Sequence, residues 1–269
     1  MTPTRSRSGL SRSMAFVALG AGWWVACAPA AEEGETELPT LVRLLADGQA
    51  VFGIFSGEHT AEQGAAMAEN QETDFVFYSL ESGPFDIPAM EAYMQGMADA
   101  AVERGRHPIT LRIPPIRDGA GVAREHVGQG LAAGVDAIVF PHVETAQEAA
   151  LAIGSMGTDV WPGNPNGRLV NILILEDQVA VQNAREIVST PGVSVAIPGP
   201  GDLRRAYEGD MEAVENAIQT VLAACKEFDV PCGITAGVDD IAERLSQGFR
   251  LIIVTNADAL AVGRAAAGR

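Results

Sequence analysis

Two carboxylates stand where they could share a cation. Glu176 directly follows the largely apolar run 170–175, and Asp202 follows a second such run, 193–198, and a Gly-Pro-Gly turn. In a β/α repeat protein the ends of successive strands lie side by side on one face, so these two side chains are expected to meet. Hard divalent cations prefer carboxylate oxygens. The pair therefore predicts a metal site, while a helix cap at Asp202 and a solvated acid at Glu176 are the structural alternatives.

A charged residue, Arg112, lies inside the largely apolar segment 109–114. A guanidinium within such a strand needs an anionic partner or must leave the core. That partner is either a neighbouring acid in a structural ion pair or the carboxylate or enolate of a substrate. Two histidines, His59 and His142, also follow strand-like runs and are expected at the same face.

Eight strand-like runs alternate with amphipathic helical segments after a first short helix at 41–46. The runs are rich in Val, Ile and Leu throughout, as in parallel strands that helices cover. They predict an α/β fold, a single (β/α)₈ TIM barrel over residues 39–269. A doubly wound open sheet is the alternative, although no GxGxxG loop follows any strand. The predicted strands are 51–55, 74–80, 109–114, 137–143, 170–176, 193–198, 231–235 and 251–255.

The first thirty residues predict a cleavable export signal. Three arginines precede the apolar run 14–26, and small residues follow at 28–30. Cys27 is a candidate lipid anchor, although Trp24 stands where such signals usually have leucine, and an uncleaved membrane anchor is the alternative. Residues 31–38 predict a polar linker. We therefore expect an exported protein, either periplasmic or a membrane-anchored lipoprotein.

The composition argues against a nucleic-acid partner and against a Schiff-base mechanism. The net charge is −17, and loss of the three arginines would bring it to about −20, which argues against a nucleic-acid partner. The single lysine, Lys226, ends a long predicted helix at the face opposite the strand ends, so a Schiff-base mechanism is not expected. Cys225 and Cys232 have no CxxC spacing and are either free or paired with each other.

With these residues in place, the chain resembles the HpcH/HpaI aldolase family, metal-dependent pyruvate aldolases of the phosphoenolpyruvate-binding barrel type. The resemblance covers nearly all of residues 41–269. It rests on five segments in the same order and spacing, namely 80–86, 111–114, 140–149, 175–176 and 199–203.

The resemblance implies a site and a reaction. A magnesium or manganese ion would be held by Glu176 and Asp202, and backbone N–H groups around Gly201 and Asp202 would bind the carboxylate of a 2-oxo acid. Arg112 would stabilise an enolate oxygen. The implied activity is retro-aldol cleavage of a 4-hydroxy-2-oxo acid to pyruvate and an aldehyde. The implied assembly is a homo-oligomer, a trimer or hexamer in which the last helix packs on a neighbour.

The chain departs from the family pattern in the proton relay. Ser79-Leu80-Glu81-Ser82 stands where the family has Asp-x-Glu-His, and serine is no base near neutral pH. His59 and His142 are the candidate replacements. Ile174 stands where glutamine is common, and the substrate loop, expected at 157–169, is short. Two alternatives stay open: an exported carboxylate- or metal-binding relative without catalysis, and a thioester lyase of the citrate-lyase β type.

Overall fold

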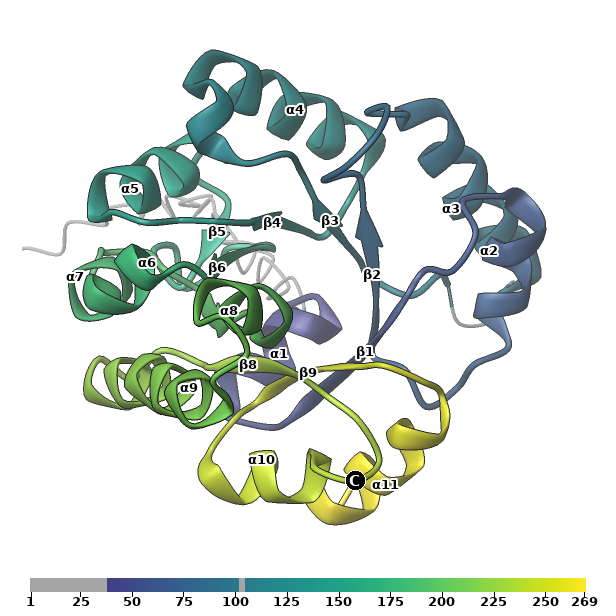
Figure 1. Cartoon of the computed structure of the whole chain (residues 1–269). Helices are drawn as coiled ribbons and strands as arrows, with labels where there is room; N and C mark the ends of the chain where they lie inside the picture. The colour runs from purple at the N-terminus through teal and green to yellow at the C-terminus, as the bar shows by residue number, and fades with distance from the viewer. Residues whose placement is uncertain (1–37, 102–104) are drawn as a thin grey trace, which may run out of the picture. The chain divides into compact units, whose positions relative to one another are not determined.

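Strands and helices alternate along the part of the chain that the computed structural model describes, residues 38–101 and 105–269 (Figure 1). The predicted export signal, with Cys27, lies outside these residues, as does nearly all of the predicted linker. The strands are β1 Val51–Phe55, β2 Phe75–Ser79, β3 Ile109–Arg112, β4 Ala137–Phe140, β5 Val160–Trp161, β6 Leu169–Leu175, β7 Val195–Pro198, β8 Gly233–Ala236 and β9 Leu251–Val254.

All the strand pairs are parallel and together form a TIM-like barrel. Pairing runs from β1 through β2, β3, β4 and β6 to β7 on one side, and through β9 to β8 on the other. A bridge between Ala196 and Cys232 then joins β7 to β8, where the Ala196 N–H donates to the Pro231 carbonyl oxygen at 3.2 Å. The predicted α/β fold with a parallel sheet is confirmed, and the strand order is that of a TIM-like barrel.

Helices surround the strands on the outside (Figure 1). Polar caps begin several of them: the Thr60 and Asp86 side chains accept from backbone N–H groups, and Thr145 and Glu148 form a capping box. Within the described residues no helix is both long and apolar enough to cross a bilayer. The helices are α1 Thr40–Ala46, α2 Ala61–Ala68, α3 Ile87–Ala100, η1 Ile116–Asp118, α4 Ala120–Ala133, α5 Ala146–Ser155, α6 Gln178–Gln182, α7 Ala184–Val188, α8 Pro200–Ala206, α9 Met211–Glu227, α10 Ile241–Gln247 and α11 Asp258–Ala267.

Two apolar cores result from the alternation of side chains along the strands. Outward residues such as Phe52 and Tyr78 pack beneath the helices. Inward residues such as Phe77, Ile174 and Ile253 fill the barrel, and α1 packs its apolar side chains against the same inner cluster. The barrel is therefore closed by side chains at its amino end, and its carboxyl end is left for chemistry.

The segment 157–169 does not lie at that carboxyl end, so its expected role as a substrate loop is wrong. It follows α5, contains the unpredicted strand β5, and pairs Val160 and Trp161 with the first two residues of β6. A connection from a helix to the next strand returns the chain to the amino face. Lys226 lies at this face too, beside Trp161 in a cavity of about 330 Å³, which agrees with its predicted distance from the site. Cys225 and Cys232 are buried free thiols.

Candidate active site at the carboxyl ends of the strands

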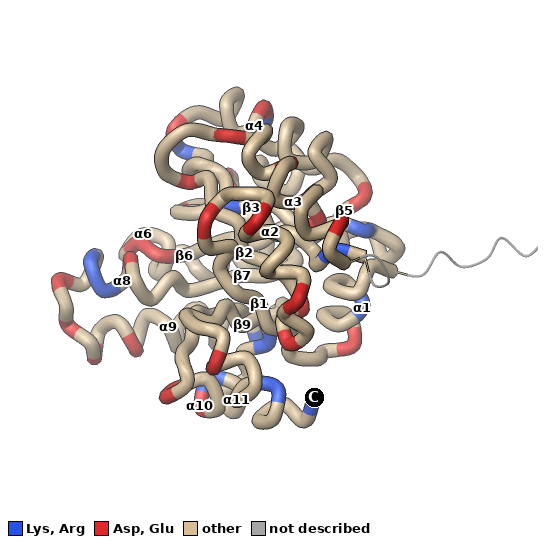
Figure 2. Tube along the Cα trace, turned by 90° about the vertical axis from the view of Figure 1, so that its right-hand side faces the viewer, with Lys and Arg blue, Asp and Glu red and all other residues tan. Residues whose placement is uncertain are grey.

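A cavity of about 450 Å³ opens at the carboxyl end of the barrel. Four of the predicted site residues line it: Arg112, the last residue of β3; Glu176, directly after β6; and Gly201 and Asp202, in the first turn of α8. Acidic residues are also spread over the surrounding helices and loops, and basic segments are fewer (Figure 2).

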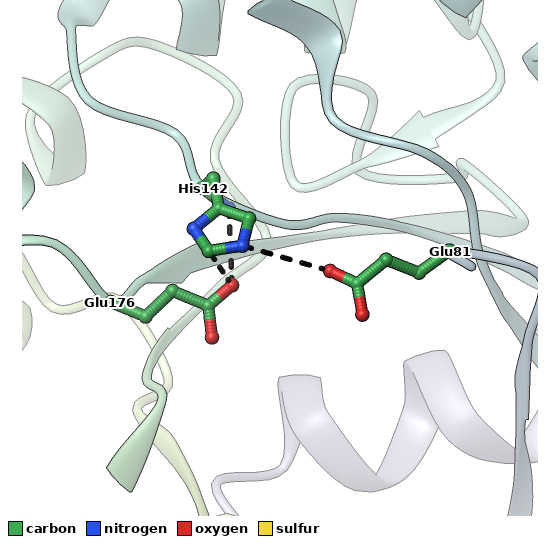
Figure 3. A group of neighbouring side chains, drawn as sticks. All are labelled: Glu81, His142 and Glu176. Atoms are coloured by element: carbon green, nitrogen blue, oxygen red, sulfur yellow. Dashed lines mark hydrogen bonds and ion pairs between the residues drawn. The ribbon is translucent and has the colours of Figure 1, made fainter. Parts of the chain in front are cut away.

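Glu81, His142 and Glu176 form a cluster whose potential ligand atoms all lie within 4.8 Å of one another (Figure 3). The His142 ring reaches Glu176 Oε1 through Nδ1 at 3.7 Å and Glu81 Oε1 through Nε2 at 3.9 Å. The backbone N–H of His142 donates to Glu176 Oε1 at 3.2 Å. A fourth group, Asp177 Oδ2, lies 2.9 Å from His142 Nδ1 and fixes the orientation of the ring.

Glu176 is only 2 % exposed, and this burial raises the pKa of its carboxyl group to about 7. The neighbouring His142 lowers that pKa, whereas the negative charges of Asp202 and Glu81 raise it. A buried carboxylate among other acids is costly unless a cation joins it. The donor atoms around Glu176 therefore fit a divalent cation, which would offset the desolvation cost of the Glu176 carboxylate and its repulsion from the neighbouring acids.

Arg112 forms an ion pair with Glu81. Its guanidinium lies 3.0 Å from Glu81 Oε2, donates from Nε to Ser79 Oγ at 2.9 Å, and stands 5.3 Å from the centre of the Phe77 ring. This is the structural ion pair expected as one alternative. Because Arg112 also lines the cavity, the same geometry holds its remaining N–H groups beside the space that a substrate anion would occupy.

Asp202 is paired with Arg205, one turn further along α8, and is not part of the Glu81 cluster. Its charge nevertheless reaches Glu176, as the pKa of that group shows. Gly199 explains how the two approach: a Cβ at this position would overlap Glu176 Oε2 and lie 2.8 Å from Glu176 Cβ. Only glycine lets the start of α8 pack directly on the buried carboxylate.

His59 does not join the carboxylates. Its ring stacks on Tyr78, with centroids 4.0 Å apart, and burial lowers its pKa. Tyr78 points outward from β2 into the core beneath the helices. The structure thus brings His142 into the cluster and places His59 against the outer layer.

Two members of the cluster were not predicted as ligands or relay residues. They are Glu81, which belongs to the segment 79–82 that departs from the family pattern, and Asp177, which follows Glu176 directly. His142 adopts φ of +52°, in the left-handed region, which turns its ring back across the mouth of the barrel. Strand spacing predicts which residues reach the rim, but this turn decides which acids the ring meets.

The parallel barrel and its acid-rich cavity define a class, the TIM-like barrel proteins that keep reactive groups on the loops after the strands. Within that class, the chain belongs to the HpcH/HpaI aldolase/citrate lyase family, whose model matches residues 53–257. The resemblance drawn from the five segments is confirmed.

A 5-keto-4-deoxy-D-glucarate aldolase of Klebsiella pneumoniae subsp. pneumoniae is 31% identical over an alignment of 144 residues, and the match covers 45% of this chain and 56% of the relative. The matched region thus spans about half the length of the curated relatives. A family protein from Burkholderia cenocepacia superposes with a TM-score of 0.69 at 23% identity, covering 84% of this chain and 96% of that one. A citrate lyase β subunit of M. tuberculosis, solved with oxaloacetate and magnesium, superposes with a TM-score of 0.61 at 16% identity, covering 84% and 100%.

Proposed function

We propose that this protein is a divalent-metal-dependent carbon–carbon lyase that cleaves a 4-hydroxy-2-oxo acid to pyruvate and an aldehyde. One observation carries the proposal: the buried Glu176 carboxylate, with its pKa raised to about 7, shares a cavity with Arg112 and Asp202 at the carboxyl end of the barrel. Carboxyl groups with shifted pKa values that share a cavity with a cationic side chain are typical of catalytic sites.

Glu176 and Asp202 would hold the ion, magnesium or manganese by the chemistry of the oxygen donors. Glu81 is also close enough to contribute, and like Asp202, which pairs with Arg205, it would share its carboxylate with an arginine, Arg112. When bound, the cation supplies Lewis-acid polarisation of the keto group.

The other groups have separate tasks. Arg112 stabilises the negative charge that develops on the oxygen when the C3–C4 bond breaks and its electron pair becomes an enolate. The N–H groups of Gly201 and Asp202, in the first turn of α8, bind the substrate carboxylate. His142, oriented by Asp177, takes the proton of the C4 hydroxyl as the aldehyde leaves, and returns a proton to C3.

The citrate-lyase-type thioester reaction is the second candidate, because a solved relative of that kind covers 84% of this chain. The two are separated by the coenzyme: a thioester lyase of that type binds CoA, and the proposed aldolase does not. Export by the segment 1–30, a lipid anchor at Cys27 and assembly into trimers or hexamers through 259–267 remain predictions.

The test is exchange of the pyruvate methyl protons in D₂O, followed by NMR with magnesium or manganese. This reaction requires the enolate but no knowledge of the aldehyde. We expect cation-dependent exchange that falls at least about a hundredfold in Glu176→Ala and Arg112→Ala. Arg106→Ala is the matched control, because Arg106 pairs with Asp136 at the amino ends of β3 and β4. Binding of pyruvate and the cation without exchange would instead support the non-catalytic relative.

A further inference from the structure

The carboxylates and the phenylalanines of the cavity lie on different strands, while Ile174 and Ile197 add apolar surface on the carboxylate side. Glu176 follows β6 and Asp202 follows β7, whereas Phe55, Phe77 and Ile253 come from β1, β2 and β9. Around the ring of strands, β1 lies four positions from β6. The two phenylalanines and Ile253 therefore face the carboxylates across the mouth of the barrel.

Phe55 is the most unusual member of this apolar side. It ends β1, is 40 % exposed, and meets Phe77 edge to face with ring centroids 5.2 Å apart and an interplanar angle of 74°. An exposed aromatic side chain at the rim of a cavity offers apolar surface to a bound ligand. The Arg112 guanidinium lies over the Phe77 ring, so the two phenylalanines are next to the position expected for the substrate anion.

Few polar groups stand among the apolar side chains on this side. Asp240 lines the cavity, but its Oδ1 accepts from the Gly237 N–H at 2.8 Å and its Oδ2 lies 3.6 Å from Arg244 Nε. A hydroxyl group placed against the two phenylalanines would lose its bonds to water without replacement. The threonines at the ends of β8 and β9, Thr235 and Thr255, are the remaining polar groups there.

We propose that Phe55, with Phe77 and Ile253, forms a subsite for an apolar group, aromatic or branched aliphatic, on the carbon chain beyond the pyruvate unit. The physiological aldehyde would accordingly be apolar and not a polyhydroxy aldehyde. This inference rests on the proposed function for the identity of the pyruvate end, and on the cavity lining alone for the other end. Phe55 would select the substrate without taking part in bond cleavage.

Calorimetric binding, with magnesium present, tests the subsite with three 2-oxo acids that cannot undergo the cleavage: pyruvate, 4-phenyl-2-oxobutanoate and 5-hydroxy-2-oxopentanoate. We expect the phenyl compound to bind at least about tenfold more tightly than pyruvate, equivalent to about 1.4 kcal/mol, and the hydroxylated compound to bind no more tightly. Phe55→Ser should reduce the phenyl-to-pyruvate affinity ratio to near one, and Phe55→Leu should keep most of it. Val122→Ser removes an exposed apolar side chain on α4 and should leave the ratio unchanged.

Equal affinities for the phenyl compound and pyruvate, or tighter binding of the hydroxylated compound, would overturn the subsite. Failure of pyruvate exchange in D₂O with the phenyl preference and its Phe55 dependence intact would overturn the proposed lyase and keep the apolar subsite. Exchange without any phenyl preference would do the reverse.

Discussion

Glu176 couples the chemistry of the site to pH. Its pKa is about 7, above the ordinary value of 4.5, so the carboxyl group keeps its proton through mildly acidic pH. A cation that binds the carboxylate must displace this proton. We expect manganese affinity to rise about tenfold per pH unit between roughly pH 5.5 and 7 and to level off above, as measured by calorimetry.

Asp202→Asn is the informative companion variant. It should weaken manganese binding about tenfold or more by replacing a negatively charged oxygen ligand with a neutral amide. It should also move the rising part of the profile to lower pH, because the charge of Asp202 no longer raises the pKa of Glu176. A flat affinity between pH 5.5 and 7 in the unsubstituted protein would show that Glu176 is already ionised there.

Asp177 is expected to be a positioning residue for His142. Asp177→Asn would loosen the ring and change which nitrogen carries the proton, so the rate of pyruvate proton exchange should fall about tenfold or more with a smaller change in KM. Glu144→Gln is the control, since Glu144 shares Arg117 with Asp177 but does not touch the histidine ring. Equal losses in both variants would mean that the ion-pair network acts only on loop structure.

For the site residues, the sequence predicted which strands contribute side chains to the cavity, but only part of the site. Glu176, Asp202 and Arg112 were found because they lie in or after strand-like runs, and the ends of successive strands in such a fold lie on one face. Glu81 as a neighbour of His142, and Asp177 as its support, depend on a left-handed backbone turn at His142 that no spacing rule specifies. His59 also lies in a loop after a strand, yet its ring stacks outward on Tyr78.

The start of α8 can be tested as an element. Gly199→Ala introduces a Cβ into the space that Glu176 occupies, and φ of −84° shows that the effect is steric and not conformational. We expect loss of cation binding and a fall in unfolding free energy of about 1–3 kcal/mol, measured by urea denaturation. The control is Gly201→Ala, two residues later, where a Cβ meets nothing within 4 Å. A Gly199→Ala variant with normal cation affinity would show that Glu176 is not held by this contact.

Elements were easier to predict than their connections. The predicted strands 51–55 and 251–255 agree with β1 and β9 to within a residue, because continuous apolar runs bounded by turns leave little choice. β5 was not predicted, because a strand of two residues has no periodicity in the sequence. The role given to 157–169 failed for a different reason: its position relative to the barrel faces depends on where α5 ends, which the sequence leaves open by several residues.

Over the whole barrel, Asp74 ties the carboxyl-terminal helix to the sheet. Its side chain is 8 % exposed, accepts from the Phe52 N–H at 2.9 Å, and pairs with Arg264 at 3.1 Å and Arg269 at 2.7 Å. Removing the acid leaves two half-buried guanidinium groups without their counter-charge. Asp74→Asn should therefore lower the unfolding free energy by about 3 kcal/mol in urea denaturation. Glu227→Gln, which breaks the exposed pair with Arg185, should leave the midpoint unchanged, and an equal effect of the two would contradict the difference in burial.

The joint between β7 and β8 has the fewest paired residues in the ring of strands. Each other neighbouring pair in the ring is held by a ladder of at least three residue pairs, whereas this one has a single bridge between Ala196 and Cys232. Local opening requires the least free energy where the fewest bonds must break. Both carboxylates proposed for the cation belong to the β6–β7 side of this joint, so a bound ion would stiffen that side and leave the flexibility of the ring at the contact between β7 and β8.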